Sequence, residues 1–216
     1  MDKDWEETAD RLANAAISDN QPTRWFDELY SAGERGEVSM PWDRGQPNGL
    51  ISEWGDRHEG AGRRALVIGS GLGRDAEYLA TRGYAVTAID VAPTAIRTAR
   101  ERHPDSTVRY RVADLLNAPQ DLVGAFDLVV ESYTVQALPP TVRATATTAV
   151  TAMVAPGGTL LVIATALPEG EALDGPPWKM SRADIDAFDL DPVLVEELDS
   201  DSGWRHWRAE FHRPAD

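Results

Sequence analysis

The sequence has no cysteine among its 216 residues, which excludes a disulfide framework, a thiolate metal site and a cysteine nucleophile. It also has no unbroken apolar run of the roughly 18 residues that a membrane-spanning helix requires. Residues 1–10 are acidic and lack the basic flank and apolar centre of a signal peptide. We therefore expect a cytoplasmic protein with no membrane partner.

A basic surface is also missing, because 36 acidic side chains outnumber 21 basic ones and give a net charge of −15. The acidic excess lies at both ends: residues 1–60 carry 14 acidic and 6 basic side chains, and residues 168–216 carry 13 and 5. Nucleic-acid binding depends on basic side chains that displace counterions from phosphates, so we expect no nucleic-acid partner. We interpret the acidic ends as solvated surface.

The composition that remains, 42% hydrophobic and 26% charged, is typical of one globular domain at this length. Residues 1–60 hold four of the seven tryptophans, on helical patterns and a loop rich in glycine and proline. We predict that they form a helical N-terminal cap, with one helix at residues 4–18, a second after Pro22, and a third at about 48–57. Residues 61–216 are predicted to be the main part of the same domain.

Strand-like and helix-like segments alternate from residue 65 to residue 164. This alternation requires crossover connections, and so it predicts an α/β fold with a parallel sheet and helices on both faces. Two more strand patterns surround an Asp-Ser-Asp-Ser-Gly turn and predict a C-terminal antiparallel hairpin that completes a mostly parallel seven-stranded sheet. The predicted strands are 65–69, 85–90, 108–112, 125–130, 159–164, 193–198 and 204–212, and the predicted helices between them are 74–82, 93–102 and 140–154.

The strongest local signal is the glycine-rich turn Gly69-Ser70-Gly71-Leu72-Gly73 after the first of these strands. Glycine lets the backbone approach a ligand, and the helix start beyond it offers free N–H groups. Asp90 ends the next strand, where a carboxylate can accept from two ribose hydroxyls. A dinucleotide loop has the spacing G-x-G-x-x-G, but Arg74 stands at the last position here, and G-x-G-x-G fits S-adenosylmethionine better.

Further contacts to S-adenosylmethionine are expected where the following strands end. Asp114 would accept from the adenine amino group while Leu115 packs on the ring, and the alternative for Asp114 is a helix N-cap; both can hold at once. The residues that we predict to bind this cofactor at the strand ends are Gly69, Ser70, Gly71, Gly73, Asp90, Val91, Asp114, Leu115 and Glu131.

These residues resemble the class I S-adenosylmethionine-dependent methyltransferases, and the resemblance covers about residues 20–213. Residues 66–75 look like the first motif of that class, and similar motifs stand at 84–93, 127–131 and 154–158. A narrower resemblance is to the thiopurine and halide/thiol methyltransferase group, including its tellurite-resistance relatives. The elements that carry it are 25–30, Met-Pro-Trp-Asp-Arg-Gly at 40–45, Ser-Tyr-Thr-Val at 132–135 and Gly-Pro-Pro-Trp-Lys at 175–179.

The narrower resemblance implies a Rossmann-like methyltransferase fold and a role for several side chains. It implies that Trp25, Leu29 and Trp42 shield the cofactor, and that Trp42, Tyr133, Trp178 and Lys179 surround the methyl acceptor. The chain departs from its plant relatives at Val135 and Gln136, where those have aromatic residues, and it has two prolines at 139–140. These departures favour a different, larger acceptor over a halide.

Methyl transfer from a sulfonium requires mainly positioning and desolvation, so a thiol acceptor needs no strong base. Tyr133 is the candidate catalytic residue, with a core tyrosine as the alternative. The four histidines, His58, His103, His206 and His212, are interpreted as structural. The sequence shows no cluster of metal-binding carboxylates and amides, and Glu131 by itself is not a metal site, so we expect no metal.

Three functions remain open. The first is S-methylation of a small-molecule thiol or similar soft nucleophile, with S-adenosylhomocysteine as the second product. The second is small-molecule O- or N-methylation, and the third is a non-catalytic protein that retains the fold. We expect a monomer or a homodimer in each case.

Overall fold

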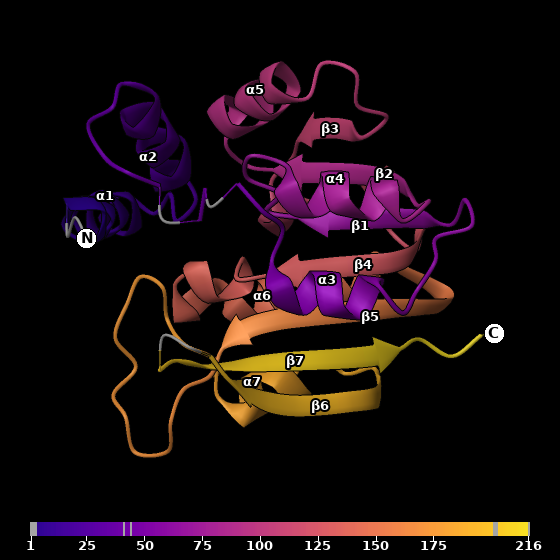
Figure 1. Cartoon of the computed structure of the whole chain (residues 1–216). Helices are drawn as coiled ribbons and strands as arrows, with labels where there is room; N and C mark the ends of the chain where they lie inside the picture. Colours follow the sequence, from indigo (N-terminus) through magenta and orange to yellow (C-terminus); the bar gives the residue numbers. More distant parts are fainter. Residues whose placement is uncertain (1–3, 41, 44, 201–202, 216) are drawn as a thin grey trace.

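Seven strands form one mixed sheet in the computed structural model, which describes residues 4–40, 42–43, 45–200 and 203–215. The strand order is β3-β2-β1-β4-β5-β7-β6. Strand β7 runs in the direction opposite to that of the other six strands (Figure 1). This arrangement confirms the predicted α/β sheet with a C-terminal antiparallel hairpin. The strands are β1 Arg64–Ile68, β2 Ala85–Asp90, β3 Arg109–Val112, β4 Phe126–Ser132, β5 Val154–Thr165, β6 Asp191–Asp199 and β7 Arg205–His212.

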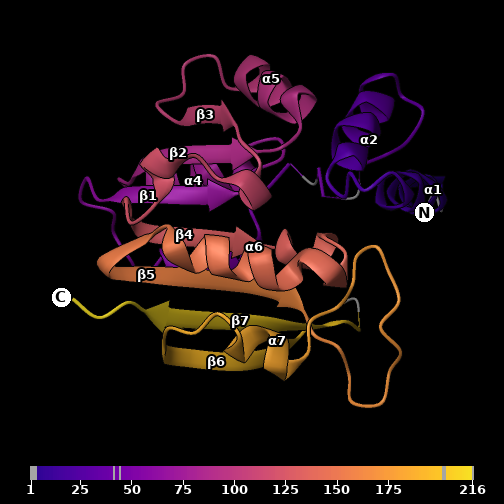
Figure 2. The same cartoon turned by 180° about the vertical axis from the view of Figure 1, so that it is seen from behind.

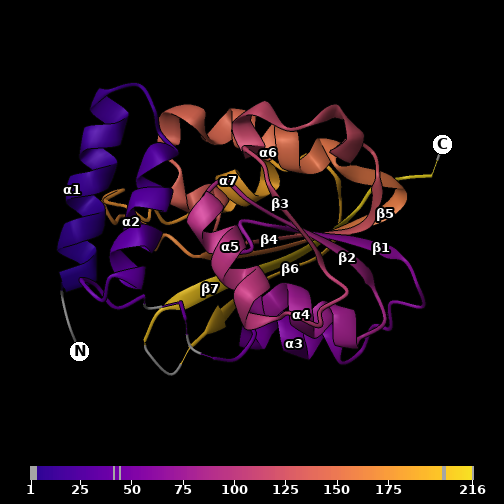
Figure 3. The ribbon, with the colours of Figure 1, turned by 90° about the horizontal axis from the view of Figure 1, so that it is seen from above.

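Helices cover both faces of the sheet (Figures 2 and 3). Helices α3, α4 and α5 pack on one face, and α6 and α7 pack on the other. The helices are α1 Asp4–Ser18, α2 Arg24–Glu34, α3 Gly49–Gly55, α4 Arg74–Thr81, α5 Pro93–Arg102, α6 Pro140–Ala152 and α7 Arg182–Asp186, with 3₁₀ turns η1 Leu115–Asn117, η2 Gln120–Leu122 and η3 Val135–Ala137. No helix within the described ranges is long and apolar enough to cross a membrane.

Two elements differ from the sequence prediction. Strand β5 begins at Val154, five residues before the predicted start, and the Pro156-Gly157-Gly158 segment is an irregularity inside the strand. Helix α7 is not among the predicted elements, because its five residues are too few to show helical periodicity. Its sequence signal is a capping box, in which Ser181 and Asp184 each accept from the other's backbone N–H.

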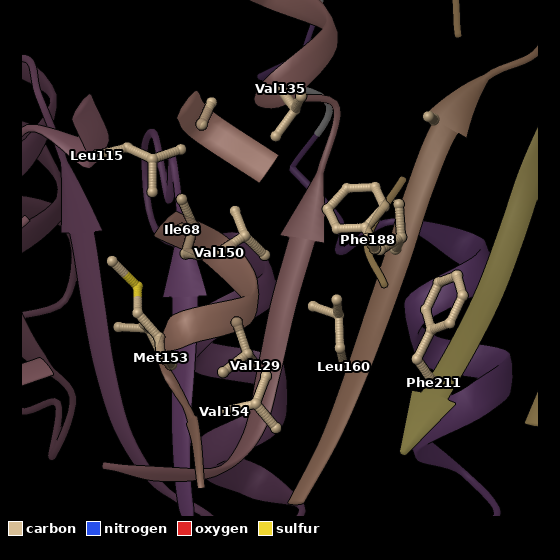
Figure 4. Packing of buried hydrophobic residues seen from close by; sticks show 14 of the residues in the cluster. Ile68, Leu115, Val129, Val135, Val150, Met153, Val154, Leu160, Phe188 and Phe211 are labelled. Atoms are coloured by element: carbon tan, nitrogen blue, oxygen red, sulfur yellow. The ribbon is translucent and has the colours of Figure 1, made fainter. Parts of the chain in front are cut away.

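The core on the α6 side of the sheet joins α6, α7 and the strands. Figure 4 shows Val129 and Leu160 from the strands near Val150 of α6 and near Met153, which follows that helix, with Phe188 and Phe211 further along the sheet. Phe188 and Phe211 are fully buried, with ring centres 6.0 Å apart. This packing fixes the positions at which β4, β5 and β7 end, and so it fixes the loops that follow them.

Helices α1 and α2 form a separate hairpin beside the carboxyl ends of β1 and β2 (Figures 1 and 3). Its small core consists of three alanines of α1 with Trp25 and Leu29 of α2. The hairpin meets α5 through polar contacts: the Asp27 carboxylate accepts from the Thr94 N–H at 2.8 Å, and Ser31 Oγ lies 3.2 Å from Thr94 Oγ1. The third predicted helix of the cap, α3, instead packs on the face of the sheet.

Candidate active site

The glycine-rich turn between β1 and α4 is held by the carboxylate that ends β2. Asp90 is buried, and its two oxygens accept from the backbone N–H groups of Gly71 at 2.8 Å and Ala92 at 2.9 Å. Burial raises the pKa of Asp90 to about 6, although these backbone donors oppose the rise. The carboxylate therefore fixes the turn at the point where the strand order reverses beside β1, which is where open α/β sheets bind ligands.

Three glycines of this turn allow three other segments to approach closely. All three have positive φ, +61° at Gly69, +50° at Gly71 and +91° at Gly73. A Cβ atom would lie 2.2 Å from Thr134 Oγ1 at Gly69, 2.7 Å from Tyr30 Oη at Gly71 and 2.3 Å from Tyr110 Oη at Gly73. The loop after β4, the cap and β3 thus converge on the turn, and any side chain there would push one of them away.

Tyr30 of α2 is a site residue that the sequence analysis did not single out. Its hydroxyl lies against Gly71 and accepts from Trp42 Nε1 at 3.1 Å. Burial, followed by the charge of Asp90, raises the pKa of Tyr30 well above its usual value. Its helical position on the same turn as Leu29 is the only sequence signal for it, and an ordinary core tyrosine would show the same signal.

The two tryptophans that were expected near the cofactor lie in different places. Trp42 is 41% exposed, and its ring makes edge contacts with Tyr30 at 6.0 Å and Trp5 at 5.9 Å. It therefore lies beside the glycine turn through Tyr30. Trp25 is buried in the α1–α2 core and stacks on Phe26 at 4.0 Å. Their contacts with a cofactor stay predictions.

The acid after β3 serves as a cap. Asp114 accepts from the Leu116 N–H at 2.9 Å, where η1 begins, and from Asn117 Nδ2 at 3.0 Å. Leu115 is buried, and Val91 is half-buried directly after Asp90. The N-cap interpretation of Asp114 is confirmed, and its contact with an adenine ring stays a prediction.

Glu131 shapes the turn after β4. It is fully buried, and its Oε1 accepts from the Thr134 N–H at 2.7 Å and the Val135 N–H at 2.8 Å. Its Oε2 has no hydrogen-bond partner among the residues that the structure describes, and burial raises the pKa of Glu131 to about 7. Its predicted contact with a cofactor stays a prediction.

Tyr133 has a backbone φ of +57°, a conformation that costs about 1–2 kcal/mol in a residue other than glycine. Its N–H donates to the Ile163 carbonyl of β5 at 2.8 Å, and its Oη lies 3.2 Å from His206 Nδ1 of β7. The sequence alone predicts a structural role for His206. Its partnership with Tyr133 spans 73 residues, so no local sequence pattern could show it.

The loop after β4 and the loop after β5 are joined by hydrogen bonds at Gln136. The Trp178 N–H donates to the Gln136 carbonyl at 2.8 Å, and Gln136 Oε1 accepts from the Thr165 N–H at 2.6 Å. Lys179 Nζ lies 2.5 Å from Glu171 Oε2 and 4.6 Å from the ring centre of Trp204. Trp178 and Lys179 therefore lie in a loop that is bonded to the loop after β4 at Gln136, and their contact with an acceptor stays a prediction.

The site fits S-adenosylmethionine in its polar groups. The Ser70 hydroxyl in the glycine turn is buried and has no partner within the described part of the chain. An acid ends β2, and the turn exposes backbone N–H groups at the start of α4. Across the same described ranges, no three His, Asp or Glu side chains gather as metal ligands would.

The fold and this site define the class: the sheet order and the glycine turn are those of Rossmann-like, S-adenosylmethionine-dependent methyltransferases. The fold is similar to that of 1,6-didemethyltoxoflavin-N1-methyltransferase from Burkholderia thailandensis, solved with S-adenosylhomocysteine. That likeness has a TM-score of 0.65, an identity of 17%, and coverage of 87% of this chain and 86% of the other. A structure that describes the conversion of a disulfide bond into a thioacetal group during echinomycin biosynthesis has a TM-score of 0.70, 24% identity and coverage of 87% and 91%.

Within that class, the chain belongs to the thiopurine S-methyltransferase family, whose model matches residues 35–210. It is 24% identical over 190 residues to a probable thiol methyltransferase 2 of Arabidopsis thaliana, covering 87% of this chain and 80% of the relative. It is 40% identical over 75 residues to a ubiquinone biosynthesis O-methyltransferase of Xanthomonas axonopodis. That match covers 34% of this chain and spans only 31% of the relative.

Proposed function

We propose that this protein transfers a methyl group from S-adenosylmethionine to a small-molecule thiol or a similarly soft nucleophile. The observation that carries the proposal is the clamp of Asp90 on the Gly71 N–H, with Gly69 of the same turn packed against Thr134. The glycine turn, where we place the cofactor, is therefore in contact with the loop after β4, where we place the methyl acceptor. The family match and the Arabidopsis thiol methyltransferase support the choice of sulfur.

The residues that would hold the cofactor are those of the glycine turn and the strand ends. The remaining lone pairs of Asp90 are available to ribose hydroxyls, and the free Ser70 hydroxyl and the N–H groups at the start of α4 are available to a carboxylate. When bound, S-adenosylmethionine supplies the electrophilic methyl group. Tyr30 and Trp42 cover the turn from the cap side and would exclude water from it.

The acceptor would lie between the loops after β4 and β5. Tyr133 is the candidate residue for contact with the nucleophile, because its strained backbone and its bond to Ile163 fix the ring at the carboxyl ends of β4 and β5. Trp178 and Lys179, in the loop after β5 that is bonded to Gln136, are proposed to line the acceptor pocket with it. Positioning of this kind contributes a large share of the catalysis of a bimolecular displacement.

The alternative is small-molecule O-methylation. The similarity to the Xanthomonas ubiquinone biosynthesis O-methyltransferase favours it, although that match spans a third of the relative. The two functions differ in the acceptor atom and share the cofactor site.

The first experiment is calorimetric titration with S-adenosylmethionine and S-adenosylhomocysteine, followed by mass-shift screening of thiols, selenols, halides and phenols. We expect micromolar binding of both ligands and methylation of thiols. Binding with methylation of phenols alone would favour the alternative. Binding of neither ligand would overturn the methyltransferase proposal.

A further inference from the structure

A histidine of the last strand faces the candidate catalytic tyrosine. We infer that His206 acts through Tyr133 as the proton acceptor for the methyl acceptor, so that this site takes acceptors that must lose a proton, such as alkyl thiols. This inference rests on the proposed function and narrows it. His206 acts only through its contact with Tyr133, and it does not touch the substrate itself.

The geometry of the pair is fixed from both sides. His206 Nδ1 lies 3.2 Å from Tyr133 Oη, and the two rings meet edge to face at 5.7 Å. The backbone of His206 lies in an interior strand, with Thr165 of β5 and Leu198 of β6 as its register partners. A histidine held by two neighbouring strands keeps its ring in place without help from a flexible loop.

The backbone of Tyr133 is also held in place by the surrounding structure. Its backbone has a φ of +57°, and its N–H donates to the Ile163 carbonyl of β5. Strained backbone in a residue other than glycine persists where the surrounding structure holds it, and such residues cluster at functional sites. The next residue, Thr134, contacts the glycine turn through Gly69, so the pair lies one residue from the proposed cofactor site.

The charged groups named on the same face of the sheet carry an excess of negative charge. Arg208 lies two residues from His206 on that face, and its guanidinium binds Glu196 of β6 at 2.6 Å and Glu53 of α3 at 3.0 Å. Glu210, two residues further along, accepts from the neutral Trp54 N–H of α3 at 2.8 Å. One arginine therefore stands against three carboxylates, and this excess of negative charge favours a positive charge on the imidazole when it accepts a proton.

In the proposed step, methyl transfer is coupled to the transfer of a proton through Tyr133 to His206. The acceptor X–H gives its proton to Tyr133 Oη while the Tyr133 hydroxyl proton moves to Nδ1 of neutral His206. The X–CH₃ bond forms as the bond from the methyl carbon to sulfur breaks, and that electron pair stays on the sulfur of S-adenosylhomocysteine. The positive charge of the sulfonium is thereby replaced by that of an imidazolium, which releases its proton to water after product loss.

The relay has a consequence for the choice of substrate. A halide or an already ionised thiol carries no proton and gains nothing from it. A neutral alkyl thiol is ionised to only a small extent at neutral pH, and so it gains most. The acceptor atom that this pair serves is therefore a protonated sulfur or oxygen.

The test compares 2-mercaptoethanol, which is mostly protonated at neutral pH, with 4-nitrothiophenol, which is ionised. In H206Q we expect kcat/KM for 2-mercaptoethanol to fall roughly 100-fold, with 4-nitrothiophenol within about three-fold of wild type. The H206Q rate with 2-mercaptoethanol should then follow the thiolate fraction, rising about ten-fold per pH unit, while the wild-type profile is flatter. Y133F should show the same selective loss, and the double variant should lose no more than either single variant.

The matched control is H212Q, a histidine of the same strand and face six residues away, and it should match wild type. Calorimetry with S-adenosylhomocysteine checks each variant before kinetics. Equal losses for both acceptors, an unchanged pH profile in H206Q, or loss of S-adenosylhomocysteine binding by H206Q would each overturn the relay. A wild-type enzyme that methylates only 4-nitrothiophenol or iodide would also overturn it, while methyl transfer itself stands. Wild type that binds neither S-adenosylmethionine nor its product would overturn the proposed function.

Discussion

Two buried carboxyl groups define the site at the scale of single residues. Asp90 ends β2, and Glu131 lies one residue before the end of β4 on the other side of β1. Each accepts two backbone N–H groups. Burial raises the pKa of both, to about 6 and about 7. Their protonation therefore changes close to neutral pH. We expect this change to affect the stability of the folded state at both groups, and ligand binding at Asp90.

Asp90 should make cofactor affinity depend on pH. Below about pH 6 the group becomes protonated and offers fewer acceptor sites, so we expect the Kd for S-adenosylhomocysteine to rise as the pH falls from 7 to 5. D90N should weaken binding by about ten-fold or more, corresponding to roughly 1–3 kcal/mol, because its amide cannot accept where the carboxylate does. Calorimetry across this pH range measures both, and a Kd for D90N equal to that of wild type would contradict the assignment.

Glu131 should make the folded state less stable as the pH rises. Its folded pKa of about 7 lies above the ordinary value of 4.5, so the native state holds more protons between these values and the free energy of unfolding falls across that window. E131Q should remove this dependence. The difference between E131Q and wild type should change by roughly 3 kcal/mol between pH 4 and pH 8. Urea unfolding of the ligand-free protein measures it, with E101Q at an exposed glutamate as the control.

At the scale of elements, the cap meets the sheet through a glycine. The hydroxyl of Tyr30 on α2 lies against Gly71, between β1 and α4, and receives the Trp42 N–H. The polar contacts of α2 with α5 hold the same hairpin from the side. The position of the α1–α2 hairpin over the glycine turn therefore depends on the absence of a side chain at residue 71.

G71A should destabilise the ligand-free protein by more than backbone strain alone. Gly71 and Gly36 both have positive φ, but only at Gly71 would a Cβ atom meet another residue, Tyr30 Oη at 2.7 Å. We expect G36A to show the strain cost, and G71A to lose about 1–3 kcal/mol more from overpacking. Removing the hydroxyl in G71A/Y30F should restore part of that loss in thermal unfolding. Equal losses in G71A and G36A would show that Tyr30 does not press on the turn.

At the scale of the whole molecule, one buried arginine connects three segments around the acceptor side. Arg143 of α6 donates to the Trp178 carbonyl at 2.8 Å in the loop after β5, and lies 3.0 Å from Asp184 of α7. Its side chain is 8% exposed. The loop that carries Trp178 is thus fixed to α6 through Arg143, 35 residues away in the sequence, which also binds α7 just after the loop.

R143M should loosen this part of the molecule as a unit. This substitution leaves the Trp178 carbonyl without its arginine donor and removes the cation beside Asp184, which keeps its hydrogen bonds from Ser181, so we expect a loss of roughly 3 kcal/mol in the free energy of unfolding. R182M removes an exposed pair with Asp186 on the same helix and should cost less than about 1 kcal/mol. Hydrogen exchange of residues 166–181 should rise in R143M only. Comparable effects of the two substitutions would exclude the connecting role of Arg143.

The sequence by itself determined most of the elements and the meeting of the glycine turn with Asp90. Helix α5 at 93–102 and strand β2 at 85–90 have the predicted bounds, because apolar periodicity and a proline at the first helical turn are local signals. The glycine turn and Asp90 are separated by one helix and one strand, so their meeting follows from a single crossover unit.

Only the tertiary structure decided which distant side chains meet. His206 lies 73 residues from Tyr133 in the sequence. The two side chains meet because β7 inserts between β5 and β6, and the register of β7 sets which of its side chains lie near the loop after β4. Tyr30 reaches Gly71 through the docking of the α1–α2 hairpin, and Arg143 reaches Trp178 through helix packing. These contacts depend on strand insertion, register and interhelical packing, which are long-range properties that no local pattern of residues contains.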